Sequence, residues 1–431
     1  MKYLLKDALV IDPLSGMERI ADILVENGLI AAIEDGIDTG QNPVYDLNGK
    51  IVAPGFIDMH VHLREPGGEG NETILTGCQA AAAGGFTAVA AMPNTNPCTD
   101  NEAVVELIKK RSADVALAEV LPIGTISKKQ QGEEISEIGS MYRNGIVAVS
   151  DDGKPLMNSE VMRRALEYTK LFGIPVISHC EDINLTAGGE MHEGYWSTIL
   201  GLKGIPAQGE EVMVARDILL SGMTGGSLHL AHLSTKGSIE LLKYALKQGI
   251  KVTAEVTPHH LLLTDEELKD YDTSTKVNPP LRSPDHVQAV RKAVIEGIVT
   301  CIATDHAPWS IEEKEQEFSK APNGISGLET AIAVCWDTLV IKEGMEPKDL
   351  IARFTTGPAA ALGLKRGFIA VGAVADLTVI DPKLIREVDT KRFYSKGKNS
   401  PYKGRKLQGW PVMTIVRGEI VMQDGKVKGA Q

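Results

Sequence analysis

The sequence lacks several features that mark particular classes of protein. Its five cysteines are widely scattered and none forms a Cys-x-x-Cys pair, so we expect a reducing cytoplasm rather than a disulfide framework. No apolar run reaches the roughly 18 residues of a membrane helix, and no basic segment with an apolar core opens the chain. No Gly-x-Gly-x-x-Gly follows an early strand, which argues against a dinucleotide-binding fold. We therefore expect a soluble protein with no membrane partner.

An excess of positive charge is also lacking. The chain has 45 basic and 57 acidic residues, a formal net charge of -12, and no basic block. Partners such as nucleic acids are therefore not expected, and an anionic substrate would have to be bound by local groups. What the chain does have is length: 431 residues, 43% of them hydrophobic, suffice for one large domain and an accessory one.

Both ends of the chain have the pattern of short β-strands joined by turns. Asn27-Gly28, between two apolar alternating runs, is a strong hairpin signal. The polar stretch 383–409 reads as a loop. We therefore expect one small β-sheet domain built from residues 1–54 and 366–431 together.

Between the two ends, residues 55–365 alternate apolar strands with helix-like segments. Such alternation predicts a parallel α/β sheet, and eight strands over about 250 residues are typical of a (β/α)8 TIM-type barrel. Composition alone also allows an open doubly wound sheet. The expected strands are 57–62, 87–92, 116–121, 146–151, 175–179, 227–232, 251–256 and 300–305.

Histidine and aspartate side chains end five of these strands. In His60-Val61-His62 the two imidazoles share one face of a strand, although alone this pair is also explained by two exposed histidines. The carboxyl ends of barrel strands meet at the face where barrel enzymes keep their active sites. We therefore expect one cluster formed by His60, His62, Asp152, His179, His232 and Asp305.

Imidazoles and carboxylates of this kind suit two Zn²⁺ ions, because a carboxylate bridges ions roughly 3.5–4 Å apart. His60, His62 and Asp305 would hold the first ion. The histidines that end the fifth and sixth strands would hold the second ion, and Asp152 would bridge the pair. Such ions polarise a carbonyl and activate water, and Asp305 would pass the proton to the leaving nitrogen.

Other polar residues near this face have less certain roles. Asp58 would either hydrogen-bond a metal-site imidazole or serve the fold alone. His259 and His260 follow the seventh strand, and we expect a supporting or structural role because six ligands are complete without them. We assign no functional role to His192, His229 and His286.

Five segments together resemble the motifs of type I dihydroorotases, which belong to the amidohydrolase superfamily. The resemblance extends over nearly the whole chain. It implies a zinc-dependent enzyme of pyrimidine biosynthesis that interconverts N-carbamoyl-L-aspartate and L-dihydroorotate. The segments are Pro54–Arg64, Met92–Thr95, Ser150–Gly153, Val256–Leu261 and Ala303–Pro308.

The resemblance also implies roles for single residues and for partners. The six His and Asp residues would be ligands of two zinc ions, with Asp305 as the catalytic proton-transfer residue. Arg64 and Asn94 would bind the substrate carboxylate, while Asn278 and the backbone at Asn323 and Gly324 would hold the ring amides. A homodimer and an assembly with aspartate carbamoyltransferase are further implications. The implied substrate-binding residues are His62, Arg64, Asn94, Asn278, Asn323 and Gly324.

The chain departs from the family pattern at one position that matters. Trp309 stands where the family usually has a histidine that helps to bind the carboxylate, and an indole donates only one hydrogen bond. Lys154, two residues after Asp152, leaves open the carboxylated-lysine bridge of related hydrolases. The shared scaffold and Trp309 leave a hydantoinase or allantoinase as an alternative. A non-catalytic partner of a carbamoyltransferase is another, against which the presence of all six ligands counts.

Overall fold

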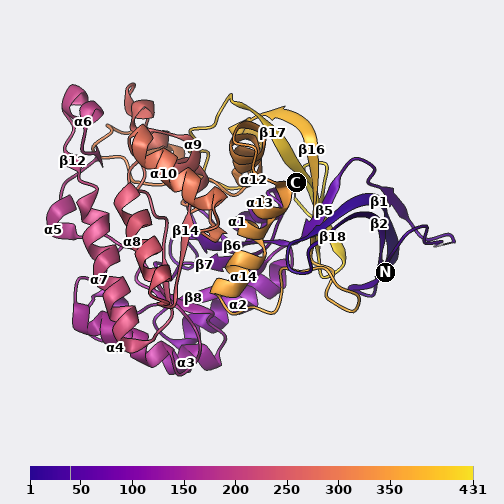
Figure 1. Ribbon diagram of the computed structural model, residues 1–431, viewed down its shortest axis with the longest axis horizontal. Coiled ribbons are helices and arrows are strands. Elements are labelled where there is room, and N and C mark those ends of the chain that lie inside the picture. Colours follow the sequence, from indigo (N-terminus) through magenta and orange to yellow (C-terminus); the bar gives the residue numbers. More distant parts are fainter. Residues whose placement is uncertain (39, 431) are drawn as a thin grey trace.

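The computed structural model describes residues 1–38 and 40–430, and it contains a parallel barrel with a mixed sheet at one side (Figure 1). Eight parallel strands are hydrogen-bonded in the order β15-β14-β13-β10-β9-β8-β7-β6. They are β6 (Phe56–Val61), β7 (Phe86–Ala91), β8 (Glu119–Gly124), β9 (Ala148–Ser150), β10 (Val176–Ser178), β13 (Leu228–Leu230), β14 (Val252–Val256) and β15 (Cys301–Ile302).

The first and last strands of this sheet meet, so that the barrel is nearly closed. Val61 forms a parallel bridge with His306, and the backbone N–H of His62 donates to the carbonyl of His306 at 2.8 Å. An open doubly wound sheet would keep these two edges apart. The predicted (β/α)8 barrel is therefore confirmed.

The barrel strands are apolar because both of their faces are covered. Every residue of β6 and β7 is buried, as expected for parallel strands between a packed interior and a layer of helices. Ile57, Ala88 and Ile177 belong to one hydrophobic cluster, to which Ala359 and Leu362 also contribute.

Helices surround the barrel (Figure 1) and begin where the sequence supplies N-cap side chains. Asn101 and Asn158 accept hydrogen bonds from the first backbone N–H groups of α2 and α4, and Thr235 does the same for α8. The α-helices of eight or more residues are α1 (Ile74–Ala83), α2 (Glu102–Val115), α4 (Ser159–Thr169), α7 (Gln208–Thr224), α8 (Lys236–Lys247), α10 (Pro284–Ile295) and α13 (Pro347–Phe354). The shorter α-helices are α3 (Ile138–Arg143), α5 (Ile183–Thr186), α6 (Tyr195–Leu200), α9 (Pro258–Leu262), α11 (Ile311–Lys314), α12 (Ala331–Cys335) and α14 (Thr356–Ala361). The two-residue strands β11 (Met191–His192) and β12 (Gly204–Ile205) pair with each other.

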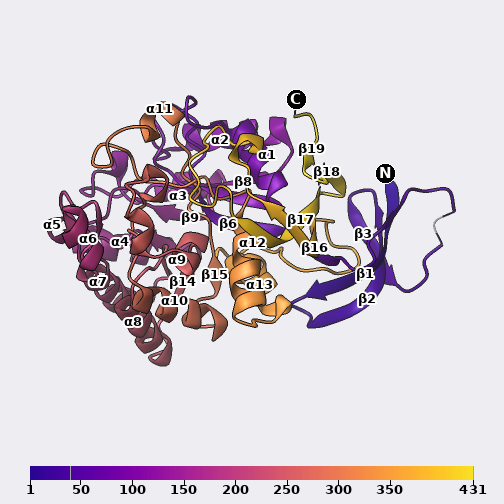
Figure 2. The ribbon, with the colours of Figure 1, turned by 90° about the horizontal axis from the view of Figure 1, so that it is seen from above.

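The second sheet contains strands from both ends of the chain, as predicted. Its order is β19-β18-β17-β16-β5-β1-β2-β3, with β4 beside β1. Strand β5 joins the two halves, because it pairs in parallel with β1 and antiparallel with β16. Figure 2 shows the N-terminal strands β1, β2 and β3 at the same end of the molecule as the C-terminal strands β16 and β17. The strands are β1 (Lys2–Asp12), β2 (Met17–Glu26), β3 (Leu29–Glu34), β4 (Val44–Asp46), β5 (Ile51–Pro54), β16 (Leu377–Glu387), β17 (Lys406–Val416), β18 (Glu419–Gln423) and β19 (Lys426–Val427).

Two local predictions for this sheet have opposite outcomes. Asn27 and Gly28 both have positive φ and connect β2 to β3 in an antiparallel hairpin, which confirms the turn. The loop predicted for 383–409 is wrong at both of its ends, because β16 runs to Glu387 and pairs with the start of β17. The side chains of that ribbon are mostly polar, so its pairing leaves no hydrophobic alternation to detect.

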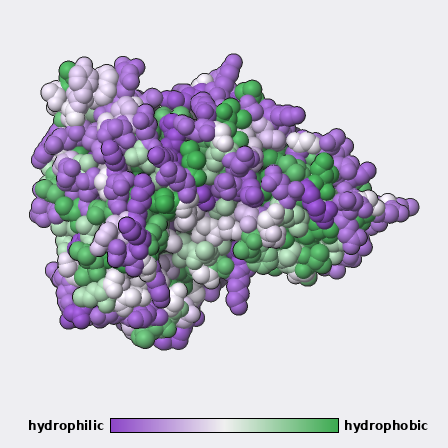
Figure 3. Space-filling view, in the orientation of Figure 1, coloured by the Kyte–Doolittle hydropathy of each residue, from purple (hydrophilic) through white to green (hydrophobic). Residues whose placement is uncertain are grey.

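The sheet from the chain ends forms one end of the molecule, and hydrophobic residues gather on the visible surface there (Figure 3). Leu14, Ile20 and Ile385 are among its exposed apolar side chains.

Within the described residues, no helix is both long and apolar enough to cross a bilayer. The division of the chain into residues 1–54 with 366–431 and residues 55–365 stays a prediction.

Candidate active site

A cavity of about 270 Å³ opens where the barrel strands end. Ten of the eleven residues predicted for the site line it, and the eleventh, His60, is fully buried with its Nε2 within 3.5 Å of Asp152 and Asp305. The strands converge there, so residues from distant parts of the chain face one another. The lining residues predicted from the sequence are His62, Arg64, Asn94, Asp152, His179, His232, Asn278, Asp305, Asn323 and Gly324.

His60 lies at the centre of the cluster. Its Nδ1 is 2.6 Å from Glu255 Oε1, and its Nε2 is 3.4 Å from Asp152 Oδ1 and 3.5 Å from Asp305 Oδ1. Both His60 Nε2 and Asp152 Oδ1 are buried without a hydrogen-bond partner. Buried polar atoms are rarely left unpaired, so these two atoms are suited to bind a cation between them.

His62 is oriented from both sides of its ring. Its Nδ1 is 2.9 Å from Asn94 Oδ1, and its Nε2 is 3.0 Å from Asp305 Oδ1. Because His62 contacts the side-chain oxygen Oδ1 of Asn94, the side-chain nitrogen Nδ2 is the group left to donate to a ligand.

The other two histidines approach the cluster from the opposite side. Nδ1 of His179 is 2.9 Å from Nε2 of His232 and 3.4 Å from Asp152 Oδ1. The second ring nitrogen of His179 is 3.0 Å from Glu181 Oε2, so a carboxylate supports this imidazole from behind. Glu181 was not predicted, although it follows His179 by two residues.

The cluster fits a metal centre in both geometry and donor type. In two overlapping sets of three side chains, all ligand atoms lie within 4.8 Å of one another. Burial disfavours the charged form of Asp305, but attraction to His60 and the bond with His62 outweigh it and lower its pKa. Ionised carboxylates beside imidazoles are the donors that Zn²⁺ prefers. The two sets are His60, Asp152, His232 and His60, His62, Asp305.

Glu255 supports this cluster and was missed by the sequence analysis. Its Oε1 is the partner of His60 Nδ1 and accepts from the backbone N–H of His232 at 3.3 Å, while its Oε2 is 3.2 Å from His229 Nε2. Burial raises its pKa, but His60 and His229 more than offset this and bring it to about 2. A lone glutamate in the apolar strand β14 was the available signal. His229, to which no role was assigned, is thus a partner of this carboxylate.

The positions of Asp58 and Lys154 bear on two open alternatives. Asp58 Oδ1 accepts from the backbone N–H groups of His60 and Thr304, each at 3.1 Å, so it joins β6 to β15 rather than bonding an imidazole. Lys154 is exposed, whereas Asp152 is buried and faces the histidines. The geometry therefore favours an aspartate over a carboxylated lysine at the centre of the cluster.

Arg64 is the only lysine or arginine among the described residues that line the cavity. Its Nε donates to the carbonyl of Pro308 at 3.3 Å, and its guanidinium carbon lies 4.4 Å from the centroid of the Trp309 ring. The indole N–H of Trp309 donates to the Asn323 carbonyl at 2.7 Å. The one hydrogen bond that the indole ring of Trp309 can donate is therefore made within the protein.

The residues predicted to hold the ring amides also have protein partners. Asn278 Nδ2 donates to Glu181 Oε2 at 2.9 Å, which leaves the Asn278 carbonyl oxygen as an acceptor. Gly324 donates its N–H to the Lys276 carbonyl, and its own carbonyl accepts from Asn399 Nδ2, both at 2.9 Å. Their contacts with a substrate stay predictions.

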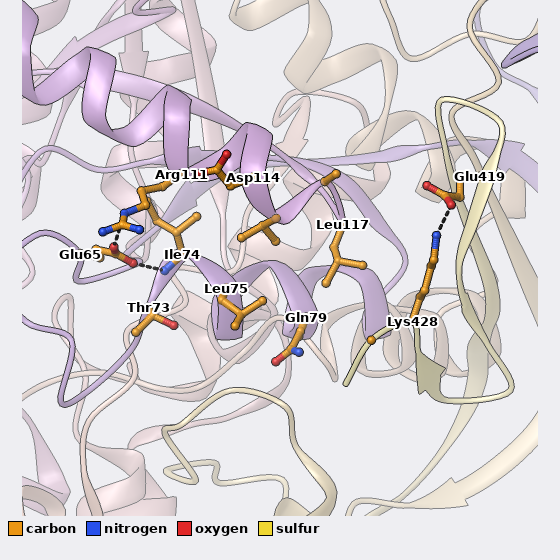
Figure 4. A pocket seen from close by; sticks show the side chains of 13 residues that line it. Glu65, Thr73, Ile74, Leu75, Gln79, Arg111, Asp114, Leu117, Glu419 and Lys428 are labelled. Atoms are coloured by element: carbon orange, nitrogen blue, oxygen red, sulfur yellow. Dashed lines mark hydrogen bonds and ion pairs between the residues drawn. The ribbon is translucent and has the colours of Figure 1, made fainter. Parts of the chain in front are cut away.

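A larger cavity, of about 640 Å³, lies between α1, α2 and the last strands of the chain (Figure 4). Four of its five charged side chains pair with one another: Glu65 with Arg111 at 3.4 Å, and Glu419 with Lys428. None of the predicted site residues lines it. The smaller cavity at the strand ends is therefore the candidate active site.

Comparisons with known proteins identify the family of the chain. Residues 49–238 match the family model described as Dihydro-orotase-like, and residues 256–422 match that of the Amidohydrolase family. The dihydroorotase of Pelotomaculum thermopropionicum is 53% identical over 99% of this chain and 100% of its own length. That of Anaeromyxobacter sp. (strain K) is 49% identical over 97% of both.

Solved structures give the same fold. The L-hydantoinase (dihydropyrimidinase) from Arthrobacter aurescens matches with a TM-score of 0.89 at 26% identity, over 99% of this chain and 97% of that one. The dihydroorotase relatives have a higher sequence identity to this chain than that structure has, and they also match it over nearly its full length. The chain belongs to the dihydroorotase family of amidohydrolases.

Proposed function

We propose that this protein is a dihydroorotase, which reversibly converts N-carbamoyl-L-aspartate into L-dihydroorotate. One observation carries the choice of substrate: the cavity sets a single arginine, Arg64, beside a cluster of histidines and aspartates. Such a cluster suits hydrolysis of a cyclic amide, and the arginine suits a carboxylate on the ring. The dihydroorotase relatives, alike over their full length, support the same choice.

We propose two zinc ions as the cofactor. His60, His62 and Asp305 would hold one ion, His179 and His232 would hold the other, and Asp152 would bridge them. The support is the donor set and the two buried atoms, His60 Nε2 and Asp152 Oδ1, that have no hydrogen-bond partner. When bound, the ions would polarise the amide carbonyl and lower the pKa of water.

The protein's own groups would then handle the proton and the substrate. Asp305, with its Oδ1 3.0 Å from His62 Nε2 and its side chain at the cavity wall, is suited to carry a proton between water and the ring nitrogen. Arg64 and the amide nitrogen of Asn94 would bind the carboxylate. The free carbonyl oxygen of Asn278 would accept from a ring N–H.

From the family resemblance we also propose a role in pyrimidine biosynthesis, a cytoplasmic location, a homodimer, and an assembly with aspartate carbamoyltransferase. The five free cysteines, four of them buried, suit a reducing compartment. Sedimentation of the pure protein, alone and with the carbamoyltransferase, would test the two assemblies.

The activity is tested with purified, zinc-loaded protein. Dihydroorotate should be opened and carbamoyl aspartate closed, while hydantoin and allantoin, which have no ring carboxylate for Arg64, should react more slowly. An Asp305→Asn variant serves as the matched inactive control. Absence of conversion in both directions would overturn the proposal, and a preference for hydantoin or allantoin would assign the other cyclic-amidase activity.

A further inference from the structure

Trp309 covers the arginine that the proposed function assigns to the substrate carboxylate. The guanidinium carbon of Arg64 lies 4.4 Å from the centroid of the indole ring, within the range of a cation–π contact. Arg64 has a φ of 61°, an uncommon value for a residue with a side chain, and its carbonyl accepts from the Gly68 N–H at 2.9 Å. Both the backbone and the side chain of Arg64 are therefore constrained.

The indole ring is itself held in place. Its Nε1 donates to the Asn323 carbonyl at 2.7 Å, and the backbone N–H of Trp309 donates to Asn399 Oδ1 at 3.2 Å. A Cβ at Gly324, where φ is 141°, would lie 3.0 Å from Nε1 and 2.5 Å from the Ala307 carbonyl oxygen. Glycine at position 324 therefore avoids a clash with the Ala307 carbonyl and leaves room beside the indole ring.

These contacts leave one part of the guanidinium group for a ligand. The Nε–H group of Arg64 donates a hydrogen bond to the Pro308 carbonyl, and Trp309 covers one face of the guanidinium plane. The edge formed by the two Nη atoms is therefore what remains for a ligand. No other lysine or arginine among the described lining residues can replace it. A planar guanidinium binds a carboxylate through two parallel bonds only when it is correctly oriented. The orientation of Arg64 therefore decides how well a carboxylate binds.

We propose that Trp309 is a positioning residue that holds Arg64 with its Nη edge toward the cavity, and so sets the preference for a ring that carries a carboxylate. Trp309 acts through Arg64, since its indole N–H already donates a hydrogen bond to the Asn323 carbonyl. The inference rests on the proposed function for the identity of the carboxylate. Preorganisation of this kind strengthens binding because less side-chain freedom is lost when the ligand binds.

The test is a set of variants measured with dihydroorotate. Trp309→Leu removes the ring face, and we expect KM to rise roughly 3- to 30-fold, the range of a cation–π contact, with kcat changed less than about twofold. Trp309→Phe retains an aromatic face and should restore most of the affinity. Trp196→Leu, at a partly buried tryptophan of α6 outside the cavity, is the matched control and should leave both constants unchanged.

A double-mutant cycle separates this role from a structural one. In an Arg64→Met background, Trp309→Leu should have no further effect on KM, because the group that it positions is absent. An equal rise in KM in both backgrounds would overturn the inference, as would an unchanged KM in Trp309→Leu alone.

Calorimetry with orotate, a ring with the same carboxylate, keeps the inference testable apart from catalysis. Orotate should bind Trp309→Leu roughly 3- to 30-fold more weakly than the wild type, and this difference should vanish when Arg64 is Met. A wild type that binds orotate but does not convert dihydroorotate would refute the proposed function alone. Equal binding by wild type and Trp309→Leu would refute the positioning role alone.

Discussion

The role of Glu255 offers a sharp test of how the cluster is held. This carboxylate is fully buried and has three hydrogen-bond partners: His60 Nδ1 at 2.6 Å, His229 Nε2 at 3.2 Å and the backbone N–H of His232 at 3.3 Å. Glu255→Gln preserves the shape but removes the charge and turns one oxygen into an N–H donor. At least one of the three groups then faces a donor instead of an acceptor.

The size of the effect follows from these contacts. Loss of a carboxylate that orients a metal-binding imidazole typically costs 10- to 100-fold in metal affinity or activity, or about 1.4–2.8 kcal/mol. Because Glu255 contacts both His60 and His232, we expect Glu255→Gln to lie at the upper end of that range.

Zinc affinity is measured by competition with a chromophoric chelator, and kcat is measured at saturating zinc. Asp22→Asn is the matched control, since Asp22 is also buried and accepts two backbone N–H groups, but in the sheet from the chain ends. It should retain the zinc affinity of the wild type. Wild-type zinc affinity and turnover in Glu255→Gln would show that Glu255 does not support the cluster.

Three other outcomes are expected from the same structure. Asp305→Asn should lower kcat by at least about 100-fold, the scale of general acid–base catalysis, with a smaller change in orotate binding; kcat within tenfold of wild type would exclude the proton-transfer role. Dialysis against a chelator should abolish activity and lower Tm, and zinc should restore both; full activity in protein shown to be metal-free would contradict the metal proposal. Burial, with Lys276 nearby, lowers the pKa of Lys314 to about 7 from 10.5. Between pH 7 and 10.5 the folded protein therefore binds fewer protons at this group than the unfolded chain does. The free energy of unfolding consequently increases as the pH rises, by at most about 1.4 kcal/mol per pH unit from this group. In urea unfolding, the free energy of unfolding should increase less between pH 7.5 and pH 9 for Lys314→Met than for wild type. An equal increase would refute the lowered pKa of Lys314.

The barrel and the position of its cluster could be predicted from the sequence because both depend on local patterns. Runs such as Phe86–Ala91 are apolar since parallel strands are buried on both faces, and eight of them alternate with helices. The carboxyl ends of such strands converge in any barrel. Polar residues at several of these ends, such as His60 and Asp305, were therefore expected to meet.

Other features were decided only by tertiary contacts between distant residues. Glu255 lies 195 positions from His60, and nothing local to β14 distinguishes a carboxylate that supports the cluster from a satisfied core residue. Likewise, the ribbon between β16 and β17 forms by pairing two polar segments, which have no hydrophobic alternation of their own.

Trp309 shows the same limit at the substrate site. Its residue type determined that its side chain can donate one hydrogen bond and stack on a cation. The folded chain decided that the bond goes to Asn323 and that the ring covers Arg64. Sequence alone determines which interactions a side chain can make, whereas the tertiary structure decides which partner is close enough to use them.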